Sequence, residues 1–134
     1  MTVLSPTSIL IGMGSKTVLV IEDDHSIARL IEIVLSGKGF HTHICLDASS
    51  ALEIFSRVRP DLVILDIHMP RRSGFSVLKR LRQEDATQNT PIVVFSVLTR
   101  GKSVDQLVRM GASDFVSKSE GVDALVEKVM SILS

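Results

Sequence analysis

Five short runs of apolar residues alternate along the chain with five longer segments in which apolar residues recur at helical spacing. The first run, Val18 to Ile21, is rich in β-branched residues and ends abruptly in acidic residues, which is typical of a strand buried on both faces. From Ser26 the apolar positions lie on one side of a helix, which Gly37 and Gly39 end. The same pattern predicts later strands at 40–46, 62–65, 92–95 and 114–117, and later helices at 48–57, 74–82, 103–110 and 122–133.

This strict alternation of strand and helix predicts a doubly wound α/β fold, because parallel strands need crossover helices to connect them. The 134 residues suffice for one ordinary domain. Residues 1–16 contain an apolar stretch, but no Lys or Arg precedes it as in a signal peptide. We interpret 1–16 as a flexible N-terminal extension and 17–134 as the domain.

The charges are balanced, with fifteen basic and fifteen acidic residues. Nothing in this balance argues for nucleic acid or for an anionic membrane surface as a partner. The single cysteine, Cys45, excludes an internal disulfide and is typical of a buried thiol in a reducing compartment. We therefore expect a cytoplasmic protein.

Polar residues follow four of the predicted strands at the same edge of the sheet, where ligands bind in such folds. They are Glu22-Asp23-Asp24, Asp66, Ser96 and Lys118. Three carboxylates about 5 Å apart would repel by roughly 3 kcal/mol per pair at an effective dielectric constant near 20. Such a cluster favours a bound cation, and Mg²⁺ prefers oxygen ligands of this kind. Asp24 has a second interpretation, as the N-cap of the first helix.

The order and spacing of these motifs resemble the receiver domain of two-component response regulators over roughly Lys16 to Leu133. The resemblance is carried by the whole set, since each motif alone is weak. The set consists of Val18-Leu19-Val20-Ile21-Glu22-Asp23-Asp24, Asp61-Leu62-Val63-Ile64-Leu65-Asp66-Ile67-His68-Met69-Pro70 with Gly74, Pro91 to Ser96, and Gly111-Ala112-Ser113-Asp114-Phe115-Val116-Ser117-Lys118. The resemblance implies a flavodoxin-like, five-stranded parallel sheet in the order 2-1-3-4-5 with five helices.

The resemblance also implies the roles of individual residues. Asp66 would be the phosphoacceptor, Lys118 a ligand of the phosphoryl group, and Ser96 and Phe115 the switch residues. The metal, Mg²⁺ or Mn²⁺, would be held by Asp23, by Asp66, by the main-chain carbonyl of His68, and by Glu22 through a water molecule.

As a receiver, the protein would be a signalling domain that catalyses only its own phosphorylation and slow dephosphorylation. The donor would be a histidine kinase or a histidine phosphotransfer protein. The output would be a downstream protein target or a self-dimer, through the face formed by the fourth helix, fifth strand and fifth helix. We expect neither nucleic acid nor a membrane as a partner.

Two alternatives stay open at this stage. A pseudo-receiver would keep the fold as an interaction module that phosphorylation does not regulate, although the complete set of site residues argues against it. A hydrolase that forms an aspartyl phosphate would normally have a second acid two residues after Asp66, where this chain has His68. Ser119 replaces the proline that follows the lysine in many receivers, and this leaves the geometry of the Lys118–Ser119 bond open.

Overall fold

The computed structural model of the protein describes residues 16–69, 73–97 and 104–134, which form strands and α-helices in the predicted alternation. The strands are β1 (Thr17–Ile21), β2 (His41–Cys45), β3 (Leu62–Leu65), β4 (Ile92–Ser96) and β5 (Asp114–Ser117). The helices are α2 (His25–Gly37), α3 (Ala51–Val58), α4 (Gly74–Gln83), α5 (Val104–Arg109) and α6 (Val122–Leu133). Three short 3₁₀ turns lie at Ala48–Ser50, Asp85–Thr87 and Lys118–Glu120.

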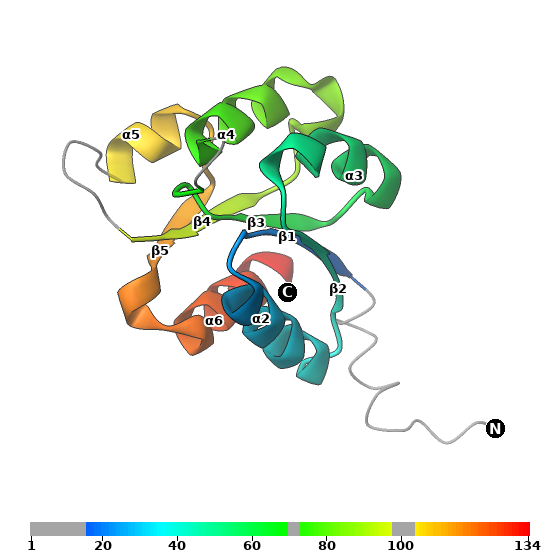
Figure 1. The fold of residues 1–134 in the computed structure, drawn as a ribbon, viewed down its shortest axis with the longest axis vertical. Coiled ribbons are helices and arrows are strands. Elements are labelled where there is room, and N and C mark those ends of the chain that lie inside the picture. Colours follow the sequence, from blue (N-terminus) through cyan, green and yellow to red (C-terminus); the bar gives the residue numbers. More distant parts are fainter. Residues whose placement is uncertain (1–15, 70–72, 98–103) are drawn as a thin grey trace.

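The five strands form one parallel sheet in the order β2-β1-β3-β4-β5 (Figure 1). The predicted fold class and strand order are therefore confirmed. In the register of the central strands Ile21 pairs with Leu65, and in that of the outer pair Ser96 pairs with Ser117. Since all strands run in the same direction, their carboxyl ends meet at one edge of the sheet.

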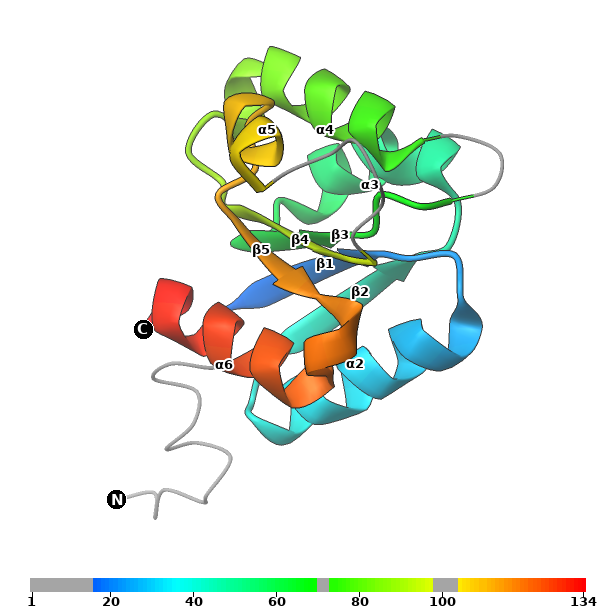
Figure 2. The ribbon, with the colours of Figure 1, turned by 90° about the vertical axis from the view of Figure 1, so that its left-hand side faces the viewer.

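Helices cover both faces of the sheet, as Figures 1 and 2 show: α2 and α6 lie on one side and α3, α4 and α5 on the other. Successive strand residues point to opposite faces, so β1, β3 and β4 each contribute to two cores. Leu19 and Ile21 belong to the core under α3 and α4, whereas Val18 and Val20 belong to the core over α2 and α6. This explains why these three strands are continuous apolar runs and not alternating ones.

The element boundaries differ most from the predicted ones at the second strand and at the helix that follows it. The predicted helix 48–57 begins as the 3₁₀ turn Ala48–Ser50 and becomes α-helical only at Ala51. The side chain of Asp47 caps that turn by accepting a hydrogen bond from the Ser49 N–H. The second strand is shorter than predicted, because Phe40 and Leu46 lie outside its ladder. The predicted extension 1–16 lies outside the described residues except for Lys16.

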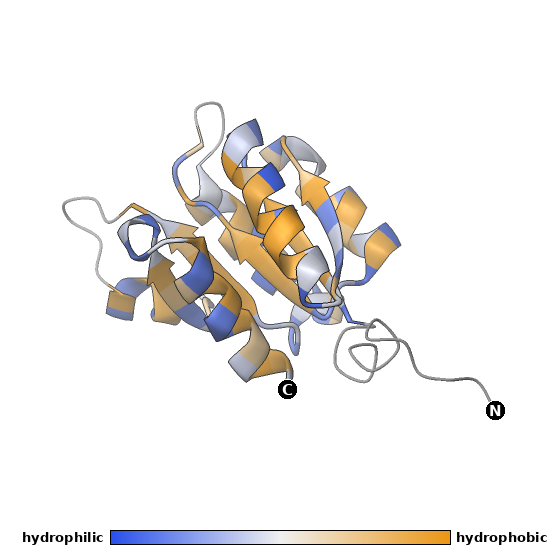
Figure 3. Cartoon of the chain, turned by 90° about the horizontal axis from the view of Figure 1, so that it is seen from below, coloured by the Kyte–Doolittle hydropathy of each residue, from blue (hydrophilic) through white to orange (hydrophobic). Residues whose placement is uncertain are grey.

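Hydropathy follows the layers of the fold. In Figure 3 the strands in the middle of the molecule are largely hydrophobic, whereas the helices carry both hydrophobic and hydrophilic positions. Within the described ranges, no helix is both long and apolar enough to cross a membrane.

Candidate functional site

The carboxyl ends of β1 and β3 bring three carboxylates together at one edge of the sheet. Glu22 and Asp23 follow β1 directly, and Asp66 follows β3. One carboxylate oxygen from each of the three side chains lies within 4.8 Å of the other two. Glu22 and Asp66 are 2% and 3% exposed, and Asp23 is half-buried. The three carboxylates, which the sequence analysis placed at one edge of the sheet, thus lie together in the structure.

Asp24, the fourth acid of this region, caps the following helix. Its Oδ1 accepts a hydrogen bond from the Ile27 N–H at 3.0 Å, at the first turn of α2. Its own N–H donates to Glu22 Oε2 at 3.2 Å. The N-cap interpretation of Asp24 is therefore confirmed, and this cap fixes the main chain beside Glu22.

Two further strands each deliver a hydrogen-bond donor to Asp66. Ser96, the last residue of β4, is 1% exposed, and its Oγ donates to Asp66 Oδ1 at 2.8 Å. Lys118, directly after β5, lies with its Nζ 3.2 Å from Asp66 Oδ2. The Asp66 carboxylate also accepts a hydrogen bond on Oδ1 from the His68 N–H at 3.1 Å. Both oxygens of this buried carboxylate are thus contacted by cationic or polar donors.

Glu22 is a buried acid that lies beside both Asp66 and Lys118. Burial raises the pKa of Glu22 to about 7, and the neighbouring Asp66 adds to this rise while Lys118 opposes it. Lys118 Nζ lies 2.8 Å from Glu22 Oε1, so the ammonium pairs with Glu22 as well as with Asp66. A single ammonium does not satisfy the three acids.

These observations test whether the residues fit a divalent cation. Three acids lie within 4.8 Å of one another beside the ammonium of Lys118, and burial raises the pKa of Glu22, so a further positive charge would stabilise the site. All the donors are oxygen atoms, which is the ligand type of Mg²⁺ and Mn²⁺. The donor set therefore fits such an ion.

Lys118 keeps its charge in this environment. Burial acts to lower the pKa of its ammonium, but the contacts with Glu22 and Asp66 outweigh burial and hold the pKa above its ordinary value. The bond from Lys118 to Ser119 is trans. This answers the question that the replacement of proline by Ser119 left open.

Gly74 brings α4 against the main chain of the phosphoacceptor candidate. A Cβ at this position would lie 2.3 Å from the Asp66 carbonyl oxygen and 2.5 Å from the Ile67 Cα. The Gly74 N–H instead donates to the Ile67 carbonyl at 2.8 Å. Because only glycine permits this approach, it fixes the loop that carries Asp66 against the first turn of α4.

The remaining predicted residues lie around this cluster. The Phe115 ring, on β5, is half-buried and packs against the core on the α3 and α4 side. The imidazole of exposed His68 lies with Nε2 3.0 Å from the Val97 carbonyl, so this nitrogen carries the proton. The contact links the loop after β3 to the loop after β4, and the sequence did not predict it.

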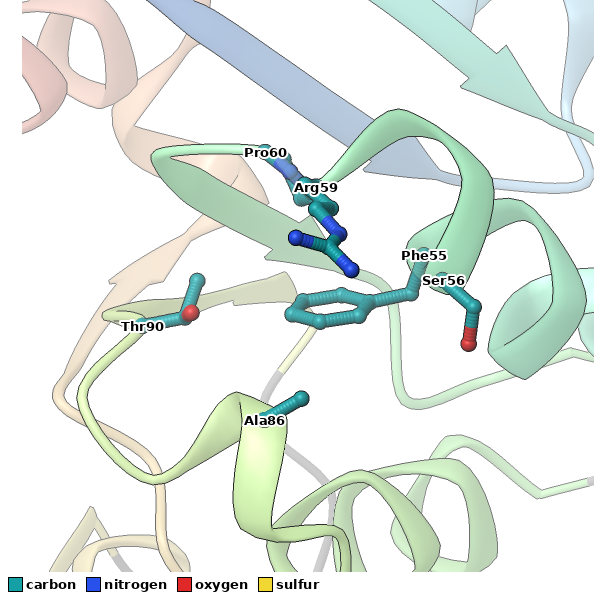
Figure 4. Close-up of a pocket in the computed structure, with 6 residues that line it drawn as sticks. All are labelled: Phe55, Ser56, Arg59, Pro60, Ala86 and Thr90. Atoms are coloured by element: carbon teal, nitrogen blue, oxygen red, sulfur yellow. The ribbon is translucent and has the colours of Figure 1, made fainter.

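A separate hollow of about 420 Å³ lies at the opposite edge of the sheet (Figure 4). Pro60 precedes β3 and Thr90 precedes β4, so these lining residues lie near the amino ends of the strands. In Figure 4 the ring of Phe55 points into the hollow from α3, with the Arg59 side chain beside it. The hollow contains none of the acidic residues above and is not the functional site.

The comparison with known proteins decides the family. Residues 18–130 match the model of the response regulator receiver domain. The chain belongs to the response-regulator receiver domain family. The resemblance seen in the motifs is therefore confirmed, and this receiver domain has the acidic cluster at the expected strand ends.

Curated relatives and solved structures agree with this assignment. The chain is 38% identical over 118 residues to the DNA-binding response regulator MtrA of Mycolicibacterium smegmatis, covering 88% of this chain and 50% of MtrA. It is 36% identical over 111 residues to the transcriptional regulatory protein DltR of Streptococcus agalactiae, covering 83% of this chain and 49% of DltR. The chain thus spans about half the length of these relatives.

Among solved structures, the Francisella response regulator 1452 receiver domain superimposes with a TM-score of 0.78 at 30% identity, covering 88% of this chain and 95% of that one. The chemotaxis protein CheY4 of Vibrio cholerae superimposes with a TM-score of 0.80 at 24% identity, covering 88% and 98%. The second comparison supports the fold alone.

Proposed function

We propose that Asp66 is the phosphoacceptor of this receiver domain and takes a phosphoryl group from a phosphohistidine donor. The observation that supports this most directly is the environment of its carboxylate. Ser96 Oγ and Lys118 Nζ contact its two oxygens from β4 and β5, at 2.8 Å and 3.2 Å. Two further acids lie beside it. Phosphoryl transfer depends mainly on such positioning and on neutralisation of charge.

In the proposed reaction a carboxylate oxygen of Asp66 attacks the phosphorus of the donor. The bond from phosphorus to the donor's imidazole nitrogen breaks, and that nitrogen leaves with the electron pair. The product is an acyl phosphate on Asp66. The Lys118 ammonium would contact a phosphoryl oxygen, and the Ser96 hydroxyl would donate to another in place of Asp66 Oδ1.

The proposed cofactor is Mg²⁺ or Mn²⁺. Asp23, Asp66 and the main-chain carbonyl of His68 would hold it, and Glu22 would act through a water molecule. When bound, this ion supplies positive charge that offsets the repulsion between carboxylates and phosphoryl oxygens. Autophosphorylation from small donors and slow autodephosphorylation would be the only catalysis, so we do not propose an enzyme acting on other substrates.

The proposed switch uses Ser96 and Phe115. Since Ser96 Oγ already contacts Asp66, phosphorylation would move it from a carboxylate oxygen to a phosphoryl oxygen and draw the end of β4 with it. Phe115 would then pass from half-buried to buried. A shift from mostly inactive to mostly active needs about 5 kcal/mol of differential stabilisation, which a few charge-assisted hydrogen bonds and the metal contacts would provide.

The surface that would change is formed by α5, β5 and α6, which are the fourth helix, fifth strand and fifth helix of the sequence prediction. Two exposed apolar side chains of α5, Val104 and Val108, lie on this part of the molecule. We propose that it binds a downstream protein or a second copy of the chain. The expected absence of a nucleic-acid partner stays a prediction, since MtrA is a DNA-binding regulator. The expected absence of a membrane partner and the cytoplasmic setting also stay predictions.

The experiment that tests this function is intact-mass measurement after incubation with acetyl phosphate and Mg²⁺. We expect the mass to rise by one phosphoryl group in the natural chain, and not in Asp66→Asn or in protein stripped of metal. Because some receivers do not use small donors, a panel of phosphorylated histidine kinases is the second donor set. Failure with both donor sets would favour the pseudo-receiver alternative.

A further inference from the structure

The ammonium of Lys118 is placed by a very short element. Lys118 is the first residue of a 3₁₀ turn of three residues, Lys118–Glu120, between β5 and α6. One main-chain hydrogen bond closes this turn: the Gly121 N–H donates to the Lys118 carbonyl at 3.2 Å. A single turn of this kind has little stability of its own. Its geometry must therefore depend on side chains that close it.

Ser117 and Glu120 close the turn on both sides of Lys118. The Ser117 N–H donates to Glu120 Oε2 at 2.8 Å, and Ser117 Oγ accepts from the main chain of the turn, including the Ser119 N–H at 3.3 Å. Together these contacts form a capping box. A hydrogen bond of 2.9 Å also joins the hydroxyls of Ser117 and Ser119. The main chain of Lys118 is thus held between two side chains that hydrogen-bond to its neighbours.

The capping box encloses the residue that contacts the Asp66 carboxylate, Lys118. Ser117 pairs with Ser96 in the sheet, so the strand ladder fixes the start of the turn beside the proposed switch hydroxyl. From this start, Lys118 reaches across to Asp66 at 3.2 Å and Glu22 at 2.8 Å. A long, flexible lysine side chain can make these contacts only when its main chain leaves the strand in the right direction. The box supplies that direction.

The residues of the capping box do not pack in the interior of the protein. Ser119 and Glu120 are exposed and Ser117 is half-buried, and none of them contributes to the hydrophobic cores. The carboxylate of Glu120 accepts from a main-chain N–H, so it is not a partner for the Lys118 ammonium. Loss of the Glu120 side chain should thus affect the site through the position of Lys118 and leave the cores unchanged.

We propose that Glu120, with Ser117, is a positioning residue for phosphoryl transfer, which aims Lys118 at Asp66. This inference rests on the proposed function, because Lys118 is assigned there to the phosphoryl group. N-terminal caps change a local equilibrium by roughly three- to thirtyfold. A small misplacement of a charge-neutralising group also slows a reaction steeply. We expect Glu120→Ala to slow phosphorylation by about tenfold.

The test is a double-mutant cycle on the rate of phosphorylation by acetyl phosphate with Mg²⁺, followed by intact mass. Glu120→Ala should be slow, whereas Glu120→Gln should keep most of the rate, because its amide oxygen still accepts from the Ser117 N–H. Glu127→Ala, which removes an exposed acid from α6, should match the natural chain. In a Lys118→Ala background, Glu120→Ala should cause no further loss. An unchanged rate in Glu120→Ala, or an equal loss without Lys118, would overturn the proposal.

A second cycle, on the free energy of unfolding in urea, uses the same variants and needs no phosphorylation. If the box positions Lys118 against Glu22 and Asp66, the effects of Glu120→Ala and Lys118→Ala should not be additive. Additive effects would contradict the positioning role. If the natural chain accepts no phosphoryl group, the proposed function fails, and the unfolding cycle alone then decides the role of Glu120.

Discussion

The raised pKa of Glu22 predicts how the stability of the metal-free protein changes with pH. In the folded protein this pKa is about 7, against an ordinary value of 4.5, mainly because the side chain is buried and because Asp66 is close. Below about pH 4.5 Glu22 is protonated in both the folded and the unfolded chain, so its ionisation does not lower the free energy of unfolding. Between about pH 4.5 and 7 the unfolded chain loses this proton first, so stability falls as pH rises and the loss is complete above the folded pKa.

The size of this loss follows from the shift. A difference of about 2.5 pKa units corresponds to about 3 kcal/mol, at 1.36 kcal/mol per unit. Glu22→Gln removes the ionisation and keeps the shape of the protonated acid. Without metal, the stability of this variant relative to the natural chain should therefore increase by about 2 to 3 kcal/mol between about pH 5 and pH 8.

The assay is urea unfolding in a chelator, monitored by far-UV circular dichroism, because the chain has no tryptophan or tyrosine for fluorescence. The exposed Glu127→Gln is the matched control for loss of one acidic charge, and its profile should follow that of the natural chain. Mg²⁺ should recover much of the stability that the natural chain loses near pH 8. Parallel pH profiles for Glu22→Gln and the natural chain would refute this account of the acidic cluster.

Three further substitutions test separate parts of the account. Gly74→Ala should lower the free energy of unfolding by about 3 kcal/mol, because the new methyl group meets the Asp66 carbonyl, whereas Gly37→Ala has open space and should change it by less than about 1 kcal/mol. Asp24→Ala should cost about 1 kcal/mol in the same urea assay through loss of its cap. We propose that the branched side chain of Val97, which follows Ser96 directly, narrows access to the phosphoryl site. Val97→Ala should then speed autodephosphorylation severalfold, and an unchanged phosphoryl lifetime, measured by intact mass, would contradict this.

The sequence predicted the central strands β1, β3 and β4 well because each of them packs in two cores. Val18 to Ile21 is continuously apolar for this reason, and its abrupt end in Glu22 marks the carboxyl edge. The positions of Asp66, Ser96 and Lys118 followed from the same rule, since each comes directly at or after a strand end. Fold and site were therefore predicted together by one physical pattern.

Contacts that depend on side-chain direction were not predicted. The imidazole of His68 reaches the Val97 carbonyl across two loops, and no spacing in the sequence indicates this contact. By contrast, the capping box had a sequence signal, because Ser117 and Glu120 have the Ser-x-x-Glu spacing of such boxes. Lys118 lies inside this motif, so the spacing of its neighbours predicts how its main chain is held.

The central claim, that Asp66 carries the phosphoryl group, is tested most directly by finding the modified residue. Borohydride reduces an acyl phosphate to an alcohol, so phosphorylated Asp66 becomes homoserine while free carboxylates are not reduced. Tryptic peptide 58–71 contains Asp66 and also Asp61, which accepts a hydrogen bond from the Thr17 N–H and serves as an internal control. After phosphorylation, reduction and tandem mass spectrometry, we predict homoserine at Asp66 and aspartate at Asp61. Homoserine at Asp61 or Asp23, or reduction at Glu22, would contradict the assignment.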